Sequence, residues 1–446
     1  MMNDSFKALL TKSADKFLAE LESSDSVRVF AHHDADGLCS AALMIEFLRF
    51  KNKKFHLTIL PQIESRNIKQ LEGKGLLVLC DFGSGQLNEL KDVIKSRKVL
   101  ILDHHQFDQA NNDDNLIHVN PYLSGVNGNS GVSASGVAYL FIKHTGFSPN
   151  AVIALIGASG DYQDVNGFKD LNQEIINECC GVIERKDLRI YGANTRPIHK
   201  ALEYSSIIIP GVSSSGSGSI NFLQELGIEL MKDGEWRTIS DLTSSEKQKL
   251  ISAIIIKRNG VDKPEDIFTT VYEAVNENGF RRNLREFSSL LNACGRLGRA
   301  SIGISVLMNK DYDELALEVN KEYKELITQS LNWFENNKSK CLETDRVFYL
   351  RAGDGIKPAV IGTICSILSN SGVINKDLII GMALDNGLIK VSARKARDND
   401  FNIGLALKKA IYGIGEGGGH NDAGGAYINK ESVELFINNI EKILKE

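Results

Sequence analysis

Short apolar runs alternate with stretches of helical periodicity between residues 27 and 156. The runs cover 27–30, 55–60, 75–80 and 98–102, and the longer helical stretches cover 37–50 and 85–95. Each run is a few residues long and shows little alternation of polar and apolar positions, which is typical of parallel strands buried on both faces. The pattern therefore predicts an α/β domain built on a doubly wound parallel sheet.

The pattern changes between about residues 205 and 340, where helices dominate. A capping box from Thr243 to Glu246 predicts a helix that ends near Lys257, and a second helix is expected over 284–297. The stretch 213–219, rich in serine and glycine, is interpreted either as a mobile loop or as an ordinary turn-rich connection. We therefore expect a helical and mixed middle region.

The last hundred residues show a second, smaller α/β pattern. Apolar strands at 378–384 and 388–392 flank Asp385-Asn386-Gly387, and such an Asn-Gly pair favours a tight hairpin. The chain has 446 residues, and at roughly 150 residues per domain three parts are expected. We predict domains at 1–205, 206–341 and 342–446.

Composition narrows the class of protein. Hydrophobic residues make up 42% of the chain, which excludes a wholly disordered protein. The net charge of −5 gives no overall positive field, although a basic face on one domain is still compatible with nucleic-acid binding. Seven cysteines without a CxxC pair indicate neither a disulfide framework nor a zinc ribbon. With no signal-peptide pattern and no apolar run of 18 residues, we expect a cytoplasmic protein that does not enter membranes.

Aspartate and histidine gather where the predicted strands end. These residues are His32, Asp34 and Asp36 after the first strand, Asp81 after the third, Asp103, His104 and His105 after the fourth, and Asp161 after an apolar helix. Any one of these clusters could equally be a helix cap or a surface pair. The carboxyl ends of parallel strands open onto one crevice, however, so the residues are expected to meet there.

Several carboxylates within a few ångströms of one another would raise each other's pKa values steeply. Divalent cations remove that penalty, and hard oxygens mixed with imidazole suit manganese or magnesium. Two such ions can promote an in-line displacement at phosphorus without a serine or cysteine nucleophile. The residues alone therefore favour a metal-dependent phosphoesterase.

The same residues resemble the motifs of the DHH phosphoesterase superfamily. The match consists of His32-x-Asp34-x-Asp36-Gly37, Asp81, Asp103-His104-His105 and Gly160-Asp161, in the family's order. The last hundred residues resemble the DHH-associated substrate domain through Ser392-Ala393-Arg394 and Gly417-Gly418-Gly419-His420, although Ala-Gly-Gly replaces the usual Ala-Ala-Gly at 423–425. The segment REFSSLLNACGRLG at 285–298 is similar to the archaeal RecJ-like branch, the GINS-associated nucleases.

The resemblance implies two manganese ions, with magnesium as the other candidate. The implied ligands are His32 and Asp34 for one ion, Asp36 and His104 for the other, and Asp81 and Asp161 to complete the site, with Asp81 as the bridge. His105 would face the substrate and help to protonate the leaving oxygen, and Asp103 would orient the loop or a histidine ring.

Substrate would be bound by the last domain. Arg394 and His420 would offer charged hydrogen bonds, and the backbone of Gly417, Gly418 and Gly419 would allow a close approach. Further arginines at 281, 282, 285, 296 and 299 either follow a nucleic-acid backbone or form a solvated face.

The leading interpretation is a manganese-dependent exonuclease that acts on single strands of DNA or RNA during replication or repair. One alternative is a replication-fork scaffold that binds the GINS complex and has little activity. The other is a phosphodiesterase for short oligonucleotides or cyclic dinucleotides.

Overall fold

The computed structural model describes residues 3–64, 67–107, 111, 113–165, 167–205, 207–259, 266–371, 373–397, 399–419 and 421–445. The chain forms two compact units, Met1–Leu317 and Glu318–Glu446. The finer division into three domains remains a prediction.

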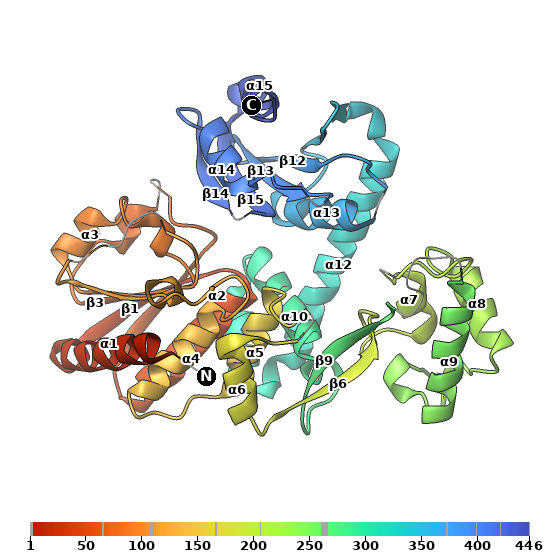
Figure 1. Ribbon diagram of the computed structural model, residues 1–446, viewed down its shortest axis with the longest axis horizontal. Helices are drawn as coiled ribbons and strands as arrows, with labels where there is room; N and C mark the ends of the chain where they lie inside the picture. The colour runs from red at the N-terminus through yellow and green to blue at the C-terminus, as the bar shows by residue number, and fades with distance from the viewer. Residues whose placement is uncertain are drawn as a thin grey trace. The chain divides into compact units, whose positions relative to one another are not determined.

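A five-stranded parallel sheet in the order β2-β1-β3-β4-β5 organises the first unit (Figure 1). Its strands are β1 (Ser26–His32), β2 (Lys54–Leu60), β3 (Leu76–Cys80), β4 (Val99–Leu102) and β5 (Leu116–Val119). β3, β4 and β5 are buried along their whole length, which explains why their sequences show no alternation. The predicted parallel α/β sheet is therefore confirmed.

Helices cover both faces of this sheet. One face packs against α1 (Asp4–Ser23), α2 (Ala35–Phe50) and α4 (Ala134–His144), and α5 (Ala151–Gly160) and α6 (Asp170–Glu178) follow in the same layer. On the other face, Val93 and Ile94 of α3 (Lys91–Ser96) join the core. The helix expected over 85–95 is shorter than predicted, because Ser84–Gln86 forms a 3₁₀ turn after Gly83, which has a left-handed φ of 113°.

An antiparallel ribbon of β6 (Val182–Leu188) and β9 (Phe268–Ala274) leads to a helical bundle of α7 (Ile198–Glu203), α8 (Gly216–Glu225) and α9 (Ser244–Lys257) (Figure 1). A small hairpin, β7 (Met231–Lys232) and β8 (Glu235–Trp236), lies between α8 and α9 in the chain. The predicted capping box is present, since Thr243 accepts a hydrogen bond from the Glu246 amide. Both interpretations of 213–219 were wrong in part, because its second half is the first turn of α8, capped by Ser215.

Three helices end the first unit and begin the second. They are α10 (Leu284–Arg296), α11 (Ala300–Met308) and α12 (Asp313–Asn336). The helix expected over 284–297 is α10, and it buries Leu284, Phe287, Leu291 and Cys294, which recur at helical spacing.

The second unit contains a six-stranded sheet in the order β10-β11-β12-β13-β15-β14. Its strands are β10 (Leu342–Glu343), β11 (Val347–Gly353), β12 (Leu378–Asp385), β13 (Leu388–Lys395), β14 (Gly415–Gly419) and β15 (Ala423–Asn429). The predicted hairpin joins β12 and β13, with Asn386 and Gly387 at positive φ.

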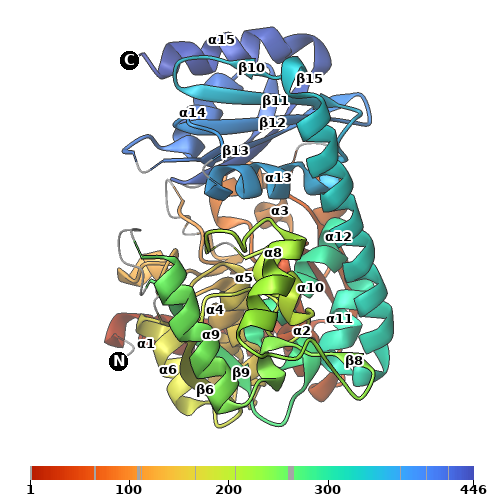
Figure 2. The same ribbon diagram turned by 90° about the vertical axis from the view of Figure 1, so that its right-hand side faces the viewer.

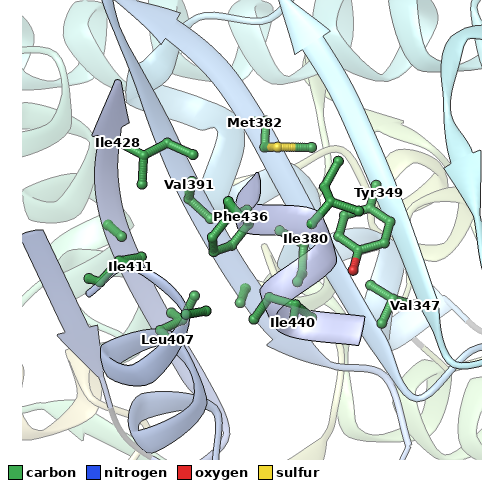
Figure 3. Packing of buried hydrophobic residues seen from close by; sticks show 14 of the residues in the cluster. Val347, Tyr349, Ile380, Met382, Val391, Leu407, Ile411, Ile428, Phe436 and Ile440 are labelled. Atoms are coloured by element: carbon green, nitrogen blue, oxygen red, sulfur yellow. The ribbon is translucent and has the colours of Figure 1, made fainter. Parts of the chain in front are cut away.

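Helices lie on both faces of this second sheet: α13 (Pro358–Ser371) on one, and α14 (Ile403–Ala410) and α15 (Val433–Ile443) on the other (Figure 2). Figure 3 shows Phe436 and Ile440 of α15 packed against Ile380 and Val391 of the sheet. Among the described residues, no helix combines the length and the apolar character needed to cross a bilayer.

Candidate metal centre

The candidate site lies where the strand order of the first sheet reverses. Because β1 lies between β2 and β3, the loops that leave β1 and β3 diverge at that point and open a crevice. His32 is the last residue of β1, Asp34 follows that strand, Asp81 follows β3, and Asp103 follows β4. The topology therefore explains why polar residues far apart in the chain face one another.

Asp34 caps α2, and this position determines where its carboxylate points. Its Oδ1 accepts a hydrogen bond from the Gly37 amide at 3.0 Å, which satisfies an otherwise unpaired N–H at the positive end of the helix. Its Oδ2 lies 2.9 Å from His32 Nδ1, and Asp81 Oδ2 lies 3.2 Å from the same nitrogen. Burial alone lowers the pKa of His32, but these two carboxylates hold it well above its usual value.

Asp36 is completely buried and is bound to the first turn of α4. Its Oδ2 accepts from the Ala134 amide at 2.6 Å, and its Oδ1 accepts from the Ser135 amide at 3.0 Å. Burial, and then the charge of Asp81, raise the pKa of Asp36 to about 6. Gly157 of α5 makes room for this arrangement, because a Cβ atom there would lie 2.6 Å from Asp36 Oδ1.

His104 directs one ring nitrogen at three carboxylates. Its Nδ1 donates to the Gly128 carbonyl at 2.8 Å, so in the neutral ring the lone pair is on Nε2. Nε2 lies 3.2 Å from Asp161 Oδ2, 3.5 Å from Asp81 Oδ1 and 3.9 Å from Asp36 Oδ2. Burial lowers the pKa of His104, but these carboxylates together raise it well above its usual value.

The donor atoms are suited to a divalent cation. Asp81 Oδ1 and His104 Nε2 are buried and have no hydrogen-bond partner among the described residues. Burying such atoms costs free energy unless a proton or a cation lies between them. Three overlapping groups of possible ligands occur in the described part of the chain, each with its donor atoms within 4.8 Å of one another. They are His32–Asp34–Asp81, Asp36–His104–Asp161 and Asp81–His104–His105.

Asp103 takes no part in these groups because its oxygens bind its own loop and the loop after β3. Oδ1 accepts from His105 Nδ1 at 2.6 Å and from the His104 amide at 2.8 Å, and Oδ2 accepts from the Ser84 amide at 2.9 Å. Burial raises the pKa of Asp103, but His105 and these hydrogen bonds bring it far below its usual value. The buried carboxylate thus fixes the ring of His105, whose side chain is 31% exposed.

All eight residues expected at the strand ends are brought together, and the role of each remains a prediction. The sequence interpretation missed the residues that hold this arrangement in place. Gln163 donates to the Gly128 carbonyl at 2.9 Å, the same oxygen that orients His104. The sequence around Gln163 contains no pattern from which this contact could have been predicted.

The helix α10 braces the loop after β1. Asn292 Oδ1 accepts from the Ala35 amide at 2.9 Å, across 257 residues of chain. A Cβ atom on Gly295 would lie 1.5 Å from the His33 carbonyl oxygen, so only glycine allows this contact. Arg285 Nε donates to Asp164 Oδ2 at 3.1 Å, three residues beyond Asp161. These positions lie in the 285–298 segment, for which the sequence offered a resemblance but no structural role.

Three arginines of the expected basic cluster are bound to carboxylates. Arg281 Nε lies 2.9 Å from Asp313 Oδ1, Arg282 Nε lies 3.0 Å from Glu273 Oε2, and Arg285 binds Asp164. These arginines therefore hold elements of the first unit together, and neither of the two sequence interpretations anticipated that role.

In the second unit, the predicted substrate-binding residues flank one strand. Arg394 pairs with Ala423 of β15, and Gly417, Gly418 and Gly419 of β14 pair with the same strand from its other side. Arg394 Nε donates to Ser366 Oγ at 2.9 Å, and its Nη1 donates to the Ala393 carbonyl at 2.7 Å. His420 lies outside the described residues.

Family models match the chain in three segments: the DHH family N-terminal domain at 26–160, the DHH-CID domain at 190–266 and the DHHA1 domain at 344–446. The uncharacterized protein MJ0831 of Methanocaldococcus jannaschii is 30% identical over 434 residues, which cover 94% of this chain and 93% of the relative. The fold and these matches define a DHH-family protein. Within that family, the chain is similar in sequence and fold to RecJ proteins.

More distant relatives share the fold. The single-stranded-DNA-specific exonuclease RecJ of Bacillus subtilis is 22% identical over 97% of this chain and 47% of its own length. RecJ from Thermus thermophilus in complex with Mn²⁺ superposes with a TM-score of 0.60 at 18% identity, over 98% of this chain and 54% of RecJ. CDC45 from Entamoeba histolytica gives a TM-score of 0.67 at 13% identity, over 99% of both chains. This chain thus spans about half the length of these two RecJ proteins.

Proposed function

We propose that this chain is a metal-dependent exonuclease specific for single strands, which hydrolyses phosphodiester bonds in DNA, RNA or both during replication or repair. The observation that carries the proposal is the convergence of buried carboxylates on the unpartnered atoms Asp81 Oδ1 and His104 Nε2. The similarity to a single-stranded-DNA-specific exonuclease supports the choice of substrate.

Two manganese ions, or magnesium ions in their place, would be held by His32, Asp34, Asp36, Asp81, His104 and Asp161. Their oxygen and imidazole donors suit either metal, and the Thermus RecJ has been crystallised with each of them. We assign Asp81 to the position between the ions because it is the one carboxylate among the described residues that belongs to two of the three ligand groups, and a carboxylate has two oxygens to offer. When bound, such ions lower the pKa of a water molecule and neutralise charge on the phosphate.

His105 is the residue that we assign to proton transfer. Its Nδ1 donates to Asp103, and its other ring nitrogen, Nε2, would give a proton to the leaving oxygen. Partial exposure of the ring lets a substrate reach it, whereas Asp103 is fully buried and acts by positioning. In the second unit, Arg394 and the backbone of Gly417, Gly418 and Gly419 would bind substrate, and His420 would join them.

The proposal is tested with a long single strand labelled at either end, offered as DNA and as RNA with Mn²⁺ or Mg²⁺. We expect stepwise loss of nucleotides from one end, which also reveals the polarity. Chelation with EDTA should stop the reaction, and Asp34→Ala or His104→Ala should reduce it at least a hundredfold without unfolding the protein. Asp92→Ala serves as the control, because that side chain is fully exposed. Substantial turnover by either ligand variant would contradict the two-metal assignment.

Absence of turnover by the wild-type protein on both polymers would overturn the exonuclease proposal. Dinucleotides and cyclic dinucleotides would then test the small-substrate alternative, and binding to the GINS complex would test the scaffold alternative.

A further inference from the structure

A row of exposed tyrosines and arginines begins beside the candidate metal centre. Tyr162 follows the candidate ligand Asp161 directly, has a left-handed φ of 59°, and is 69% exposed. The guanidinium of Arg285, on α10, lies 5.5 Å from the centre of the Tyr162 ring. The first ring of the row therefore belongs to the residue next to a candidate ligand, and the guanidinium of Arg285 packs against it.

The row continues along α10. Ser289 lies one helical turn after Arg285 and interacts with the hydroxyl of Tyr191. Desolvation raises the pKa of Tyr191, and the charges that act on its hydroxyl include those of Glu286 and Arg196. The Asn194 amide donates to Glu286 Oε1 at 3.3 Å, which holds the Tyr191 loop against the helix.

Arg196 lies between two tyrosine rings. Its guanidinium is 5.2 Å from the centre of the Tyr191 ring and 5.8 Å from that of Tyr204. The two tyrosines remain 38% and 61% exposed, respectively. Within the part of the chain that the structure describes, Arg196 has no carboxylate within ion-pair distance, unlike Arg285. Its charge is therefore available to an anion from solution.

We propose that Tyr162, Tyr191 and Tyr204, with Arg196, form a stacking path that binds the bases of a single-stranded nucleic acid as it reaches the candidate metal centre. This inference rests on the proposed function for its choice of occupant. Aromatic faces alternating with cations are what an unstacked strand requires, because each base offers a flat face and each linkage a negative charge. A duplex does not fit this description, since its bases are already stacked.

The test measures binding separately from hydrolysis. A labelled 15-nucleotide strand with phosphorothioate linkages, which resist cleavage, is titrated with the full-length protein in Mn²⁺ and followed by fluorescence anisotropy. A strand of equal length and charge that lacks bases is the second ligand. We expect the strand with bases to bind at least tenfold more tightly, because the baseless strand cannot stack.

The variants locate the effect. Tyr204→Ala should raise the Kd for the strand with bases about tenfold, whereas Tyr204→Phe should change it less than twofold. Tyr312→Ala is the matched control, because that tyrosine is also partly exposed in the first unit but lies outside the row. Arg196→Gln should lower the slope of log Kd against log salt by about one.

Equal affinity for the two strands, or a Tyr204→Ala protein that binds like wild type, would overturn the stacking path. If the wild type still hydrolyses single strands in that case, the exonuclease proposal survives without it. Conversely, base-dependent binding that Tyr204→Ala weakens, in a protein without turnover, would support the path and overturn the proposed activity.

Discussion

At the scale of single residues, burial determines the chemistry of the candidate site. His104 and Asp103 are neighbours in the chain, yet His104 faces three carboxylates, whereas Asp103 accepts hydrogen bonds from its own loop and from the loop after β3. The unpartnered Nε2 of His104 therefore favours a cation, whereas Asp103 is already satisfied. Two adjacent residues of one motif thus have different roles, and their hydrogen-bond partners distinguish these roles.

We predict that Asp103→Asn slows turnover about ten- to hundredfold while metal affinity changes little, because the change weakens the orientation of His105 and removes no ligand. The measurement is kcat on a labelled single strand, together with a Mn²⁺ titration. Asp92→Asn is the control at an exposed carboxylate. A large loss of Mn²⁺ affinity in Asp103→Asn would show instead that this residue ligates the metal.

At the scale of elements, α10 is the brace that keeps the ligand loop in place. Its Asn292 and Gly295 contact the loop after β1, and its Arg285 binds the segment after α5. One helix therefore controls two of the segments that supply candidate ligands. A disturbance of its packing should affect the site even though no ligand lies on α10.

We predict that Gly295→Ala destabilises the protein by about 1–3 kcal/mol and weakens Mn²⁺ binding, because the added methyl group would overlap the His33 carbonyl. Urea unfolding and a Mn²⁺ titration measure the two effects. Gly216→Ala in α8 is the matched control, since a Cβ atom there meets its nearest neighbour at an ordinary 3.4 Å. Equal stability of the two variants would refute the close packing of α10 against the loop.

At the scale of the whole molecule, the free energy of unfolding depends on pH through titratable side chains that are buried in the first sheet, such as His118. His118 on β5 is surrounded by Phe107 and by Ser84, whose hydroxyl lies 2.9 Å from His118 Nε2. Burial lowers the pKa of His118 to about 4, from its usual 6.5. Between these values the unfolded chain binds more protons than the folded protein, so stability falls as the pH falls.

We predict that the free energy of unfolding of wild type, measured relative to that of His118→Gln, falls by up to about 3 kcal/mol when the pH is lowered from 7.5 to 4.5. Glutamine is the suitable replacement because it keeps a polar contact but does not titrate. Urea unfolding of both proteins at the two pH values provides the measurement. Other titrating groups contribute equally to both proteins and cancel in the difference. A difference that does not vary with pH would mean that His118 is accessible to protons in the folded state.

The sequence by itself determined the sheet, the hairpin and the candidate ligands. β3 and β4 are continuous apolar runs because both their faces are buried, and the polar residues that follow them can only lie at the carboxyl edge of the sheet. The Asn386-Gly387 pair similarly requires positive φ angles that few other residues tolerate. These features are local, so spacing along the chain reveals them.

Only the tertiary structure decided which groups pair with the arginines, which residues support the ligand loop and which orient the candidate ligands. Arg281, Arg282 and Arg285 look alike in sequence, but each has a carboxylate partner on a different element. Asn292 reaches Ala35 across 257 residues, and Asn194, in the loop after Tyr191, reaches Glu286 of α10 across 92 residues. Periodicity cannot predict such contacts, because they depend on the path of the chain between the partners. The sequence therefore indicated the chemistry of the site, and the fold decided its geometry.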